Sequence, residues 1–164
     1  ARYNLALCHR LLGDVDQARA MLEAYRKENP KDERAAEVAH QLGALDEESG
    51  RYAEAAGEYE RALASKVDAA LAVELNYRVG VCREKLGDEK SALAAYARAS
   101  AHGDRANTYR LSALARSAAL YETRKDYPKA LAAYRDLIKN ATDPEIVVAA
   151  RERASELQSG GAKQ

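Results

Sequence analysis

Hydrophobic and polar positions along the chain follow one pattern that returns every 37 or 38 residues. An alanine marks the same point of each copy, at Ala18, Ala55, Ala92 and Ala130. Three copies carry a glycine five residues before this alanine and three carry a tyrosine four residues after it, namely Gly13, Gly50, Gly87, Tyr59, Tyr96 and Tyr134. A period in this range is typical of stacked supersecondary units, because no single unit can bury its apolar face alone.

The spacing of apolar residues within each copy is helical, and a turn divides each copy into two helices. We predict four helix pairs and a ninth helix. The first pair covers about 2–12 and 16–28. In the other three pairs the first helix covers about 33–48, 69–86 and 105–124, and the second helix ends near 65, 101 and 140, respectively. The ninth helix covers about 145–158. The units are residues 1–31, 32–67, 68–103 and 104–142, with a capping helix at 144–158 and a flexible tail at 159–164. They form a single array over residues 1–158.

Turn and cap residues stand at the boundaries of these helices. The three glycines lie where a first helix must end with a positive φ, which glycine adopts at low cost. Asp32, Asp68 and Asp104 each precede a first helix, where a carboxylate can accept the unpaired N–H groups. Asp143 and Pro144 together give an N-cap and a first helical residue for the ninth helix.

Composition supports an all-α fold and limits the classes of partner. Apolar residues make up 47% of the chain, without tryptophan or phenylalanine, so alanine, leucine and ten tyrosines must fill the interior. Lysine plus arginine equals aspartate plus glutamate, at 26 each, so no net field attracts nucleic acid or acidic lipid. No apolar run reaches the length of a membrane span, and we expect no direct membrane insertion. Cys8 and Cys82 lie two units apart, too far to form a disulfide, and we expect both to be small buried residues.

The repeated residues resemble the tetratricopeptide repeat. The second copy carries its pattern as Leu42-Gly43, Gly50-Arg51-Tyr52, Ala55, Tyr59 and Ala62, and the third as Val79-Gly80, Gly87-Asp88, Ala92, Tyr96 and Ala99. The resemblance implies a right-handed superhelical α-solenoid of about four helix pairs. The family period is roughly 34 residues, whereas the pattern in this chain returns every 37 or 38 residues. Longer periods of this kind resemble those of bacterial cell-envelope members of the family. This similarity implies the periplasm or cell envelope as the location, with the cytoplasm as the alternative.

The resemblance also implies a groove lined by the first helices. It places Tyr3, His40, Tyr77 and Ala115 on one row of this groove and Asn4, Gln41, Arg78 and Arg116 on the next. The partner-binding residues are then Tyr3, Asn4, His40, Gln41, Tyr77, Arg78 and Arg116. Tyrosine and arginine are frequent energetic anchors on such walls, which suit a peptide or a partner domain. The tyrosines of the second helices, Tyr59, Tyr96 and Tyr134, are expected to be core residues.

These observations favour a protein-binding scaffold or adaptor. One alternative is a structural segment that self-associates through its N-terminal end, where Leu5, Leu7 and Leu11 have no preceding helix to cover them. Another is an RNA-binding helical repeat, which the surplus of acids over bases among the groove positions opposes.

The sequence offers no motif for catalysis or for binding a metal. His9, His40 and His102 lack ligand spacing, and no phosphate loop or nucleophile motif occurs. We therefore expect no enzymatic activity, no metal and no cofactor. Because the chain begins inside a helical pattern, we also expect it to be part of a longer protein.

Overall fold

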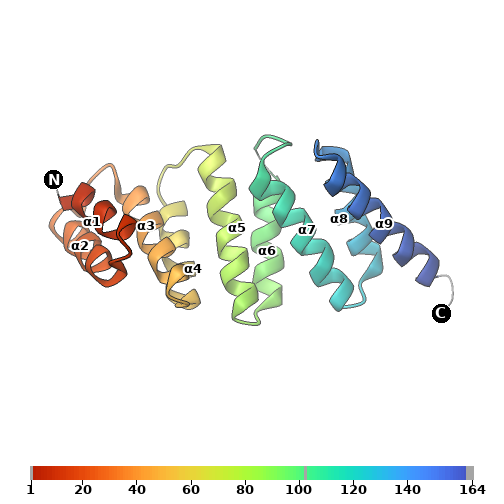
Figure 1. The fold of residues 1–164 in the computed structure, drawn as a ribbon, viewed down its shortest axis with the longest axis horizontal. Coiled ribbons are helices and arrows are strands. Elements are labelled where there is room, and N and C mark those ends of the chain that lie inside the picture. Colours follow the sequence, from red (N-terminus) through yellow and green to blue (C-terminus); the bar gives the residue numbers. More distant parts are fainter. Residues whose placement is uncertain (1, 102, 162–164) are drawn as a thin grey trace.

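Alanine-rich segments with helical apolar spacing form nine α-helices in the part of the chain that the computed structural model describes, residues 2–101 and 103–161. The helices are α1 (Arg2–Leu11), α2 (Val15–Glu28), α3 (Ala35–Glu48), α4 (Tyr52–Leu63), α5 (Ala69–Lys85), α6 (Glu89–Ala101), α7 (Thr108–Thr123), α8 (Tyr127–Asn140) and α9 (Pro144–Gly161). Figure 1 shows them side by side along the long axis, in the order of the chain.

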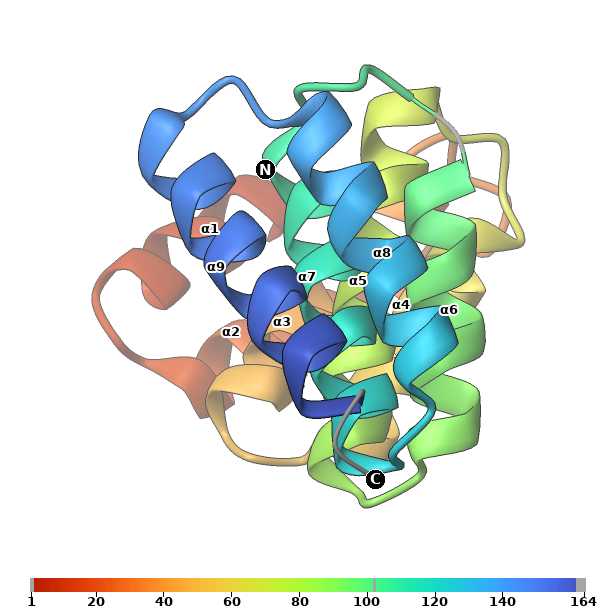
Figure 2. The same ribbon diagram turned by 90° about the vertical axis from the view of Figure 1, so that its right-hand side faces the viewer.

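The helices form two layers. Each of α1, α3, α5 and α7 packs against the helix that follows it, and each second helix of a pair packs against the next first helix. In Figure 2, α4, α6 and α8 lie on one side and the first helices on the other, with α1 and α9 displaced away from α5. The side formed by α1, α3, α5, α7 and α9, here named the first-helix face, is therefore concave. The predicted all-α solenoid is confirmed.

The turns within the helix pairs have the predicted backbone conformation. Gly13, Gly50 and Gly87 have φ values of 82°, 74° and 76°, in the left-handed region that glycine adopts without a steric penalty. In the fourth pair Lys125 takes this position, with φ of 59°. A left-handed lysine carries strain, since its Cβ crowds the neighbouring carbonyl.

The predicted caps are correct at two helices and wrong at two others. Asp68 accepts a hydrogen bond from Leu71 N at 2.8 Å, and Asp143 accepts one from Glu145 N at 2.9 Å. Asp32 and Asp104 do not cap, because α3 and α7 begin three or four residues later, at Ala35 and Thr108. Each of these two carboxylates instead accepts from a backbone N–H inside the preceding turn.

Small residues let the two helices of a pair approach closely. The marker alanines of the four copies are fully buried, with 0% exposure. Gly43 faces the ring of Tyr59 and Gly80 faces the ring of Tyr96, so closely that a Cβ atom on Gly80 would lie 2.3 Å from Tyr96 Cε1. Tyr59 and Tyr96 are fully buried, as predicted, whereas Tyr134 in the last pair is half-buried.

Two predictions at the ends of the array are corrected. Cys8 is exposed rather than buried, because among the described residues α1 packs mainly against α2, whereas α5 packs against both α4 and α6 and Cys82 is buried as expected. The helix α9 continues to Gly161, so residues 159–161 are helical and do not belong to a flexible tail. Residues 162–164, the rest of that predicted tail, lie outside the described part of the chain.

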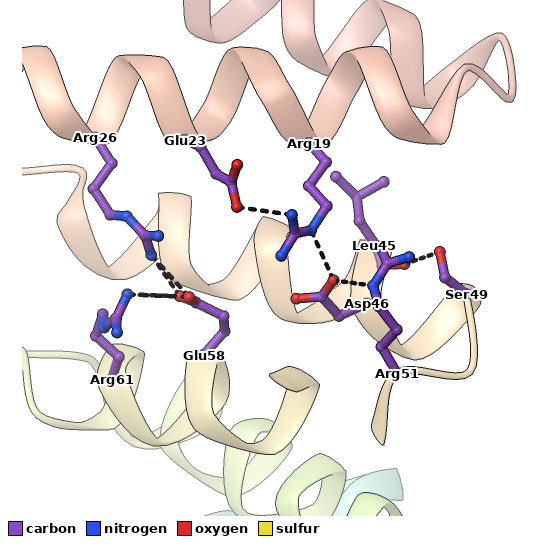
Figure 3. A network of polar contacts seen from close by, with 9 residues as sticks. All are labelled: Arg19, Glu23, Arg26, Leu45, Asp46, Ser49, Arg51, Glu58 and Arg61. Atoms are coloured by element: carbon purple, nitrogen blue, oxygen red, sulfur yellow. Dashed lines mark hydrogen bonds and ion pairs between the residues drawn. The ribbon is translucent and has the colours of Figure 1, made fainter. Parts of the chain in front are cut away.

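A polar network joins the first two repeats on the side away from the first-helix face. Asp46, at the end of α3, is completely buried and accepts hydrogen bonds from Arg19 Nε of α2 at 2.9 Å and Arg51 Nε at 2.8 Å (Figure 3). Nearby, Glu58 of α4 accepts from Arg26 of α2 at 2.8 Å. These contacts fix α2 against α3 and α4 by charge as well as by apolar packing.

Candidate functional site

The residues predicted to bind a partner all lie on first helices. Tyr3 and Asn4 are on α1, His40 and Gln41 on α3, Tyr77 and Arg78 on α5, and Arg116 on α7. Asn4 is exposed, and the five residues from α3, α5 and α7 are half-buried. The first-helix face therefore brings six of the seven predicted residues to a surface that a ligand can reach.

Tyr3 is the exception, and its predicted contact with a ligand is corrected. Its side chain is only 5% exposed. The ring packs 5.9 Å from the ring of Tyr25, and the guanidinium of Arg34 lies 5.5 Å above it. Tyr3 is thus part of the core of the first pair, covered by Arg34 in a cation–π contact.

Arg78 is held by acids of its own chain. Its Nε donates to Glu74 Oε1 at 2.8 Å, one turn earlier on α5, and its Nη1 donates to Glu47 Oε2 of α3 at 3.2 Å. His40 Nε2 lies 3.4 Å from the same Glu74 oxygen. Burial lowers the pKa of His40, although Glu74 opposes this shift. Arg78 therefore links α3 to α5 and has only part of its hydrogen-bonding capacity free for a ligand.

The same contact recurs at the next two junctions between repeats. A tyrosine hydroxyl from a second helix donates to a glutamate of its partner first helix, and that glutamate also accepts from an arginine of the next first helix. The three sets are Tyr59–Glu47–Arg78, Tyr96–Glu84–Arg116 and Tyr134–Glu122–Arg153. We name them the junction triads. The sequence contains their signal, since both the glutamates and the arginines recur at intervals of 37 or 38 residues.

At the first junction the basic residue lies on the earlier of the two first helices. Arg10 occupies the position of the triad glutamates, and Gln41 occupies the position of the triad arginines. Arg10 donates to Gln41 Oε1 and, at 2.6 Å, to Glu48 Oε1. Each junction on the first-helix face is thus closed by a charged or polar contact between consecutive first helices.

Hollows open beside three of these junction contacts. One of about 540 Å³ lies between α1 and α3, one of about 310 Å³ between α3 and α5, and one of about 460 Å³ between α7 and α9. Their lining includes Leu7, Arg10, Leu11, Gln41 and Glu48 in the first, Ala44, Glu47, Glu48, Tyr52, Arg78, Val81 and Lys85 in the second, and Ala119, Glu122, Thr123, Tyr134 and Arg153 in the third. We name them the junction hollows. They lie along the C-terminal halves of the first helices, beyond most of the predicted rows.

Of the two cysteines, Cys82 is buried in the core and Cys8 is exposed. Burial raises the pKa of the Cys82 thiol to about 12, so this buried sulfur stays protonated and unreactive. Within residues 2–101 and 103–161, no three His, Cys, Asp or Glu side chains gather as a metal site would require. None of the helices in this part combines the length and apolarity needed to cross a bilayer.

Two models of the tetratricopeptide repeat family match the chain, one at residues 1–32 and the other at residues 40–108. Together they span more than half of its length, and the chain belongs to the tetratricopeptide repeat family. Tetratricopeptide repeat domains generally bind proteins, and the chain is a protein-interaction scaffold in this general sense. No curated protein matches the sequence.

Solved structures with the same fold have low sequence identity to the chain. A crystal structure of the MamA protein is 21% identical with a TM-score of 0.72, covering 99% of this chain and 85% of that one. A tetratricopeptide repeat protein from Parabacteroides merdae is 16% identical with a TM-score of 0.79, covering 97% of this chain and 59% of that one. A second MamA crystal structure is 20% identical with a TM-score of 0.69, covering 97% of both chains. At these identities the similarity concerns the fold alone.

Proposed function

We propose that the first-helix face binds an extended peptide segment of a partner protein. The observation that carries this proposal is the row of junction hollows, which recur in the same register along a concave face. An extended peptide rises only about 3.3 Å per residue, so side chains several residues apart can enter different hollows. The junction triads hold the walls in place before a ligand arrives, and a preorganised site loses less conformational entropy on binding.

The polar character of the hollows supports a peptide over RNA. The three triad arginines are already paired with glutamates of the same face. Backbone phosphates need uncompensated cations, because phosphate neutralisation supplies most of the affinity for nucleic acid. A peptide backbone, which carries both donors and acceptors, suits alternating acids and bases better.

The test is a peptide selection followed by directed blocking of the hollows. Peptides selected from a random display library on the whole chain are titrated by calorimetry against wild type, Lys85→Glu and Ala119→Trp. Both positions are exposed and line a hollow without belonging to a triad. We expect each variant to weaken binding by about tenfold, or ~1.4 kcal/mol, at an unchanged melting temperature.

Matched controls lie outside the face, on α6. Lys90→Glu and Ala94→Trp make the same chemical changes at exposed positions and should leave binding as in wild type. Equal affinity of the hollow variants and the controls would refute the assignment to the first-helix face.

Self-association is a second proposal, supported by exposed leucines at one end of the array. Leu5, Leu11 and Leu12 are 47%, 87% and 76% exposed at the outer side and end of α1. Exposed leucines of this kind favour burial against a second apolar surface. Sedimentation equilibrium of the chain should show dimers that Leu5→Ser with Leu12→Ser abolishes; neither leucine lines a junction hollow. A monomer at about 100 µM would contradict this proposal, since the dimer dissociation constant would then lie above about 100 µM, as for weak, non-specific contacts.

A further inference from the structure

A fourth hollow lies at the opposite end of α7, between the first turns of α7 and α9. It has a volume of about 350 Å³, and its lining consists of Ala106, Thr108, Leu111, Ser112, Ala115, Leu137, Thr142, Asp143 and Ile146. We propose that this hollow, here named the Ala115 hollow, receives one aromatic side chain of a bound peptide, with a basic residue next to it in the peptide. This inference rests on the proposed peptide-binding function and adds a specificity site to it.

In the preceding repeat, a tyrosine ring occupies the position equivalent to the Ala115 hollow. At the junction of α5 and α7 the ring of Tyr77 lies 5.5 Å from the ring of Tyr109 and 6.0 Å from that of Tyr96. Its hydroxyl accepts a hydrogen bond from Arg116 Nε at 3.4 Å. An aromatic side chain of the chain itself therefore occupies the space between these two first helices.

The two earlier junctions also have a ring at this register. The guanidinium of Arg34, which directly precedes α3, lies 5.5 Å from the centre of the Tyr3 ring, and Glu74 Oε1 of α5 lies 3.4 Å from His40 Nε2. The equivalent residue on α7 is Ala115, which ends at Cβ. The residue equivalent to Tyr109 is Ile146, which is left 38% exposed. The Ala115 hollow is thus the place of a ring that the chain supplies at three junctions and omits at the fourth.

The floor of the hollow is suited to an aromatic ring. Leu111 and Leu137 are 9% and 4% exposed and belong to the core of the last repeat. A ring placed over them would bury further apolar surface between Leu111 and Ile146, and aromatic side chains gain more from such burial than small ones.

The rim of the hollow adds a charge preference. Among the lining residues in the described part of the chain, Asp143 alone is charged. Its Oδ1 accepts from Glu145 N at 2.9 Å, which fixes the carboxylate at the start of α9. A lysine or arginine next to the aromatic residue would place a cation near this acid, whereas a glutamate there would be repelled.

The experiment maps binding of short probes to the whole isotope-labelled chain by NMR. The probes are N-acetyl-Phe-Lys-amide, N-acetyl-Ala-Lys-amide and N-acetyl-Phe-Glu-amide. We expect the Phe-Lys probe to shift the amide signals of Leu111, Ser112 and Ile146 with a Kd on the order of 1 mM. The Ala-Lys probe should give no shift there, and the Phe-Glu probe should bind several-fold more weakly.

Variants separate the hollow from general surface binding. Ala115→Tyr restores the ring seen at the other junctions, so it should abolish the shifts and keep or raise the melting temperature. Ala132→Tyr, at an exposed position on α8, is the matched control and should bind as wild type does. Ile146→Ala, which removes one wall, should weaken the Phe-Lys probe, and Asp143→Asn should remove the preference for lysine over glutamate.

Two results would overturn the inference. One is the absence of shifts at these amides up to about 10 mM probe, a limit beyond which binding is too weak to select a side chain. The other is wild-type binding by both Ala115→Tyr and Ile146→Ala. A negative result here leaves peptide capture by the junction hollows standing, because those hollows are tested with other residues and other ligands. If the probes bind but no selected peptide responds to Lys85→Glu or Ala119→Trp, only the broader proposal fails.

Discussion

Asp46 is the side chain whose environment differs most from the alanine and leucine interior around it. It is fully buried, and only its Oδ1 has hydrogen-bond partners among the described residues, namely Arg19 and Arg51. A buried carboxylate is costly unless cations compensate it, and here two guanidinium groups from different helices do so. The contact also leaves those arginines dependent on Asp46.

We predict that Asp46→Ala lowers the free energy of unfolding by about 1–3 kcal/mol, because it leaves two guanidinium groups, 32% and 35% exposed, without their shared acid. Urea denaturation measures the change. The control is Glu23→Ala, which removes the other acid that pairs with Arg19. Glu23 Oε1 lies 2.9 Å from Arg19 Nη1, but the side chain of Glu23 is 41% exposed. Exposed pairs contribute less than about 1 kcal/mol. Similar losses in the two variants would show that Asp46 has no special role.

Gly80 and Gly57 allow a matched prediction on helix packing. Gly80→Ala should destabilise the fold by about 1–3 kcal/mol, since its Cβ would meet three ring atoms of the fully buried Tyr96. Gly57→Ala, in the exposed middle of α4, meets nothing within 4 Å. It should stabilise by up to about 1 kcal/mol through helix propensity alone. The same urea measurement decides, and a stabilising Gly80→Ala would contradict the close approach of α5 and α6.

At the scale of elements, the junction triads connect three helices at once. In the triad of Tyr96, the hydroxyl on α6 donates to Glu84 of α5 at 2.6 Å, and Arg116 of α7 donates to the same carboxylate at 3.1 Å. Burial, together with this acceptor, raises the pKa of Tyr96. The same causes raise the pKa of Tyr59, and they raise that of Tyr134 to about 12.

These shifts predict a loss of stability in alkali. Above about pH 10 the unfolded chain releases its tyrosine protons while the folded chain keeps them on the triad tyrosines. The unfolded state then binds fewer protons than the native state, so the free energy of unfolding falls as the pH rises from about 10. Tyr96→Phe should make this fall shallower by up to about 1.4 kcal/mol per pH unit.

The measurement is urea denaturation at several pH values between neutrality and strong alkali, with tyrosinate absorbance followed in parallel. Tyr127→Phe, at a half-exposed position at the start of α8, is the control. If the slope of Tyr96→Phe equals that of wild type, the buried hydroxyl does not hold its proton as the structure indicates.

Helix pairs, turns and tyrosine packing could be predicted from the sequence because each depends on residues within one repeat. Gly43 against Tyr59 is such a case, since the two residues share one helix pair. The pairing of Glu84 with Arg116 could not be predicted in the same way, although Arg116 was placed on the groove and both residues belong to series that recur with the repeat. It depends on how far consecutive first helices are rotated and shifted, and a period in the sequence does not contain this offset.

At the scale of the whole molecule, the chain is a one-dimensional stack in which each helix packs mainly against its neighbours. The sequence analysis failed at two residues of α1, since Cys8 is exposed and Tyr3 is buried against Tyr25 and Arg34. Stability in such a stack is close to a sum of local interfaces. Damage at one end should therefore stay near that end.

Ala150 tests this locality. It lies on α9, is 3% exposed and packs in one cluster with Leu111, Leu114 and Leu137. Ala150→Asp would bury a carboxylate among these leucines, which costs more than detaching the helix. Amide hydrogen exchange should then speed up by at least about tenfold in α9, α8 and α7 and remain unchanged in α1 to α4. The control Ala149→Asp, at the neighbouring exposed position of the same helix, should exchange as wild type does. Equal acceleration along all described helices in Ala150→Asp would show instead that the stack unfolds as a single cooperative unit.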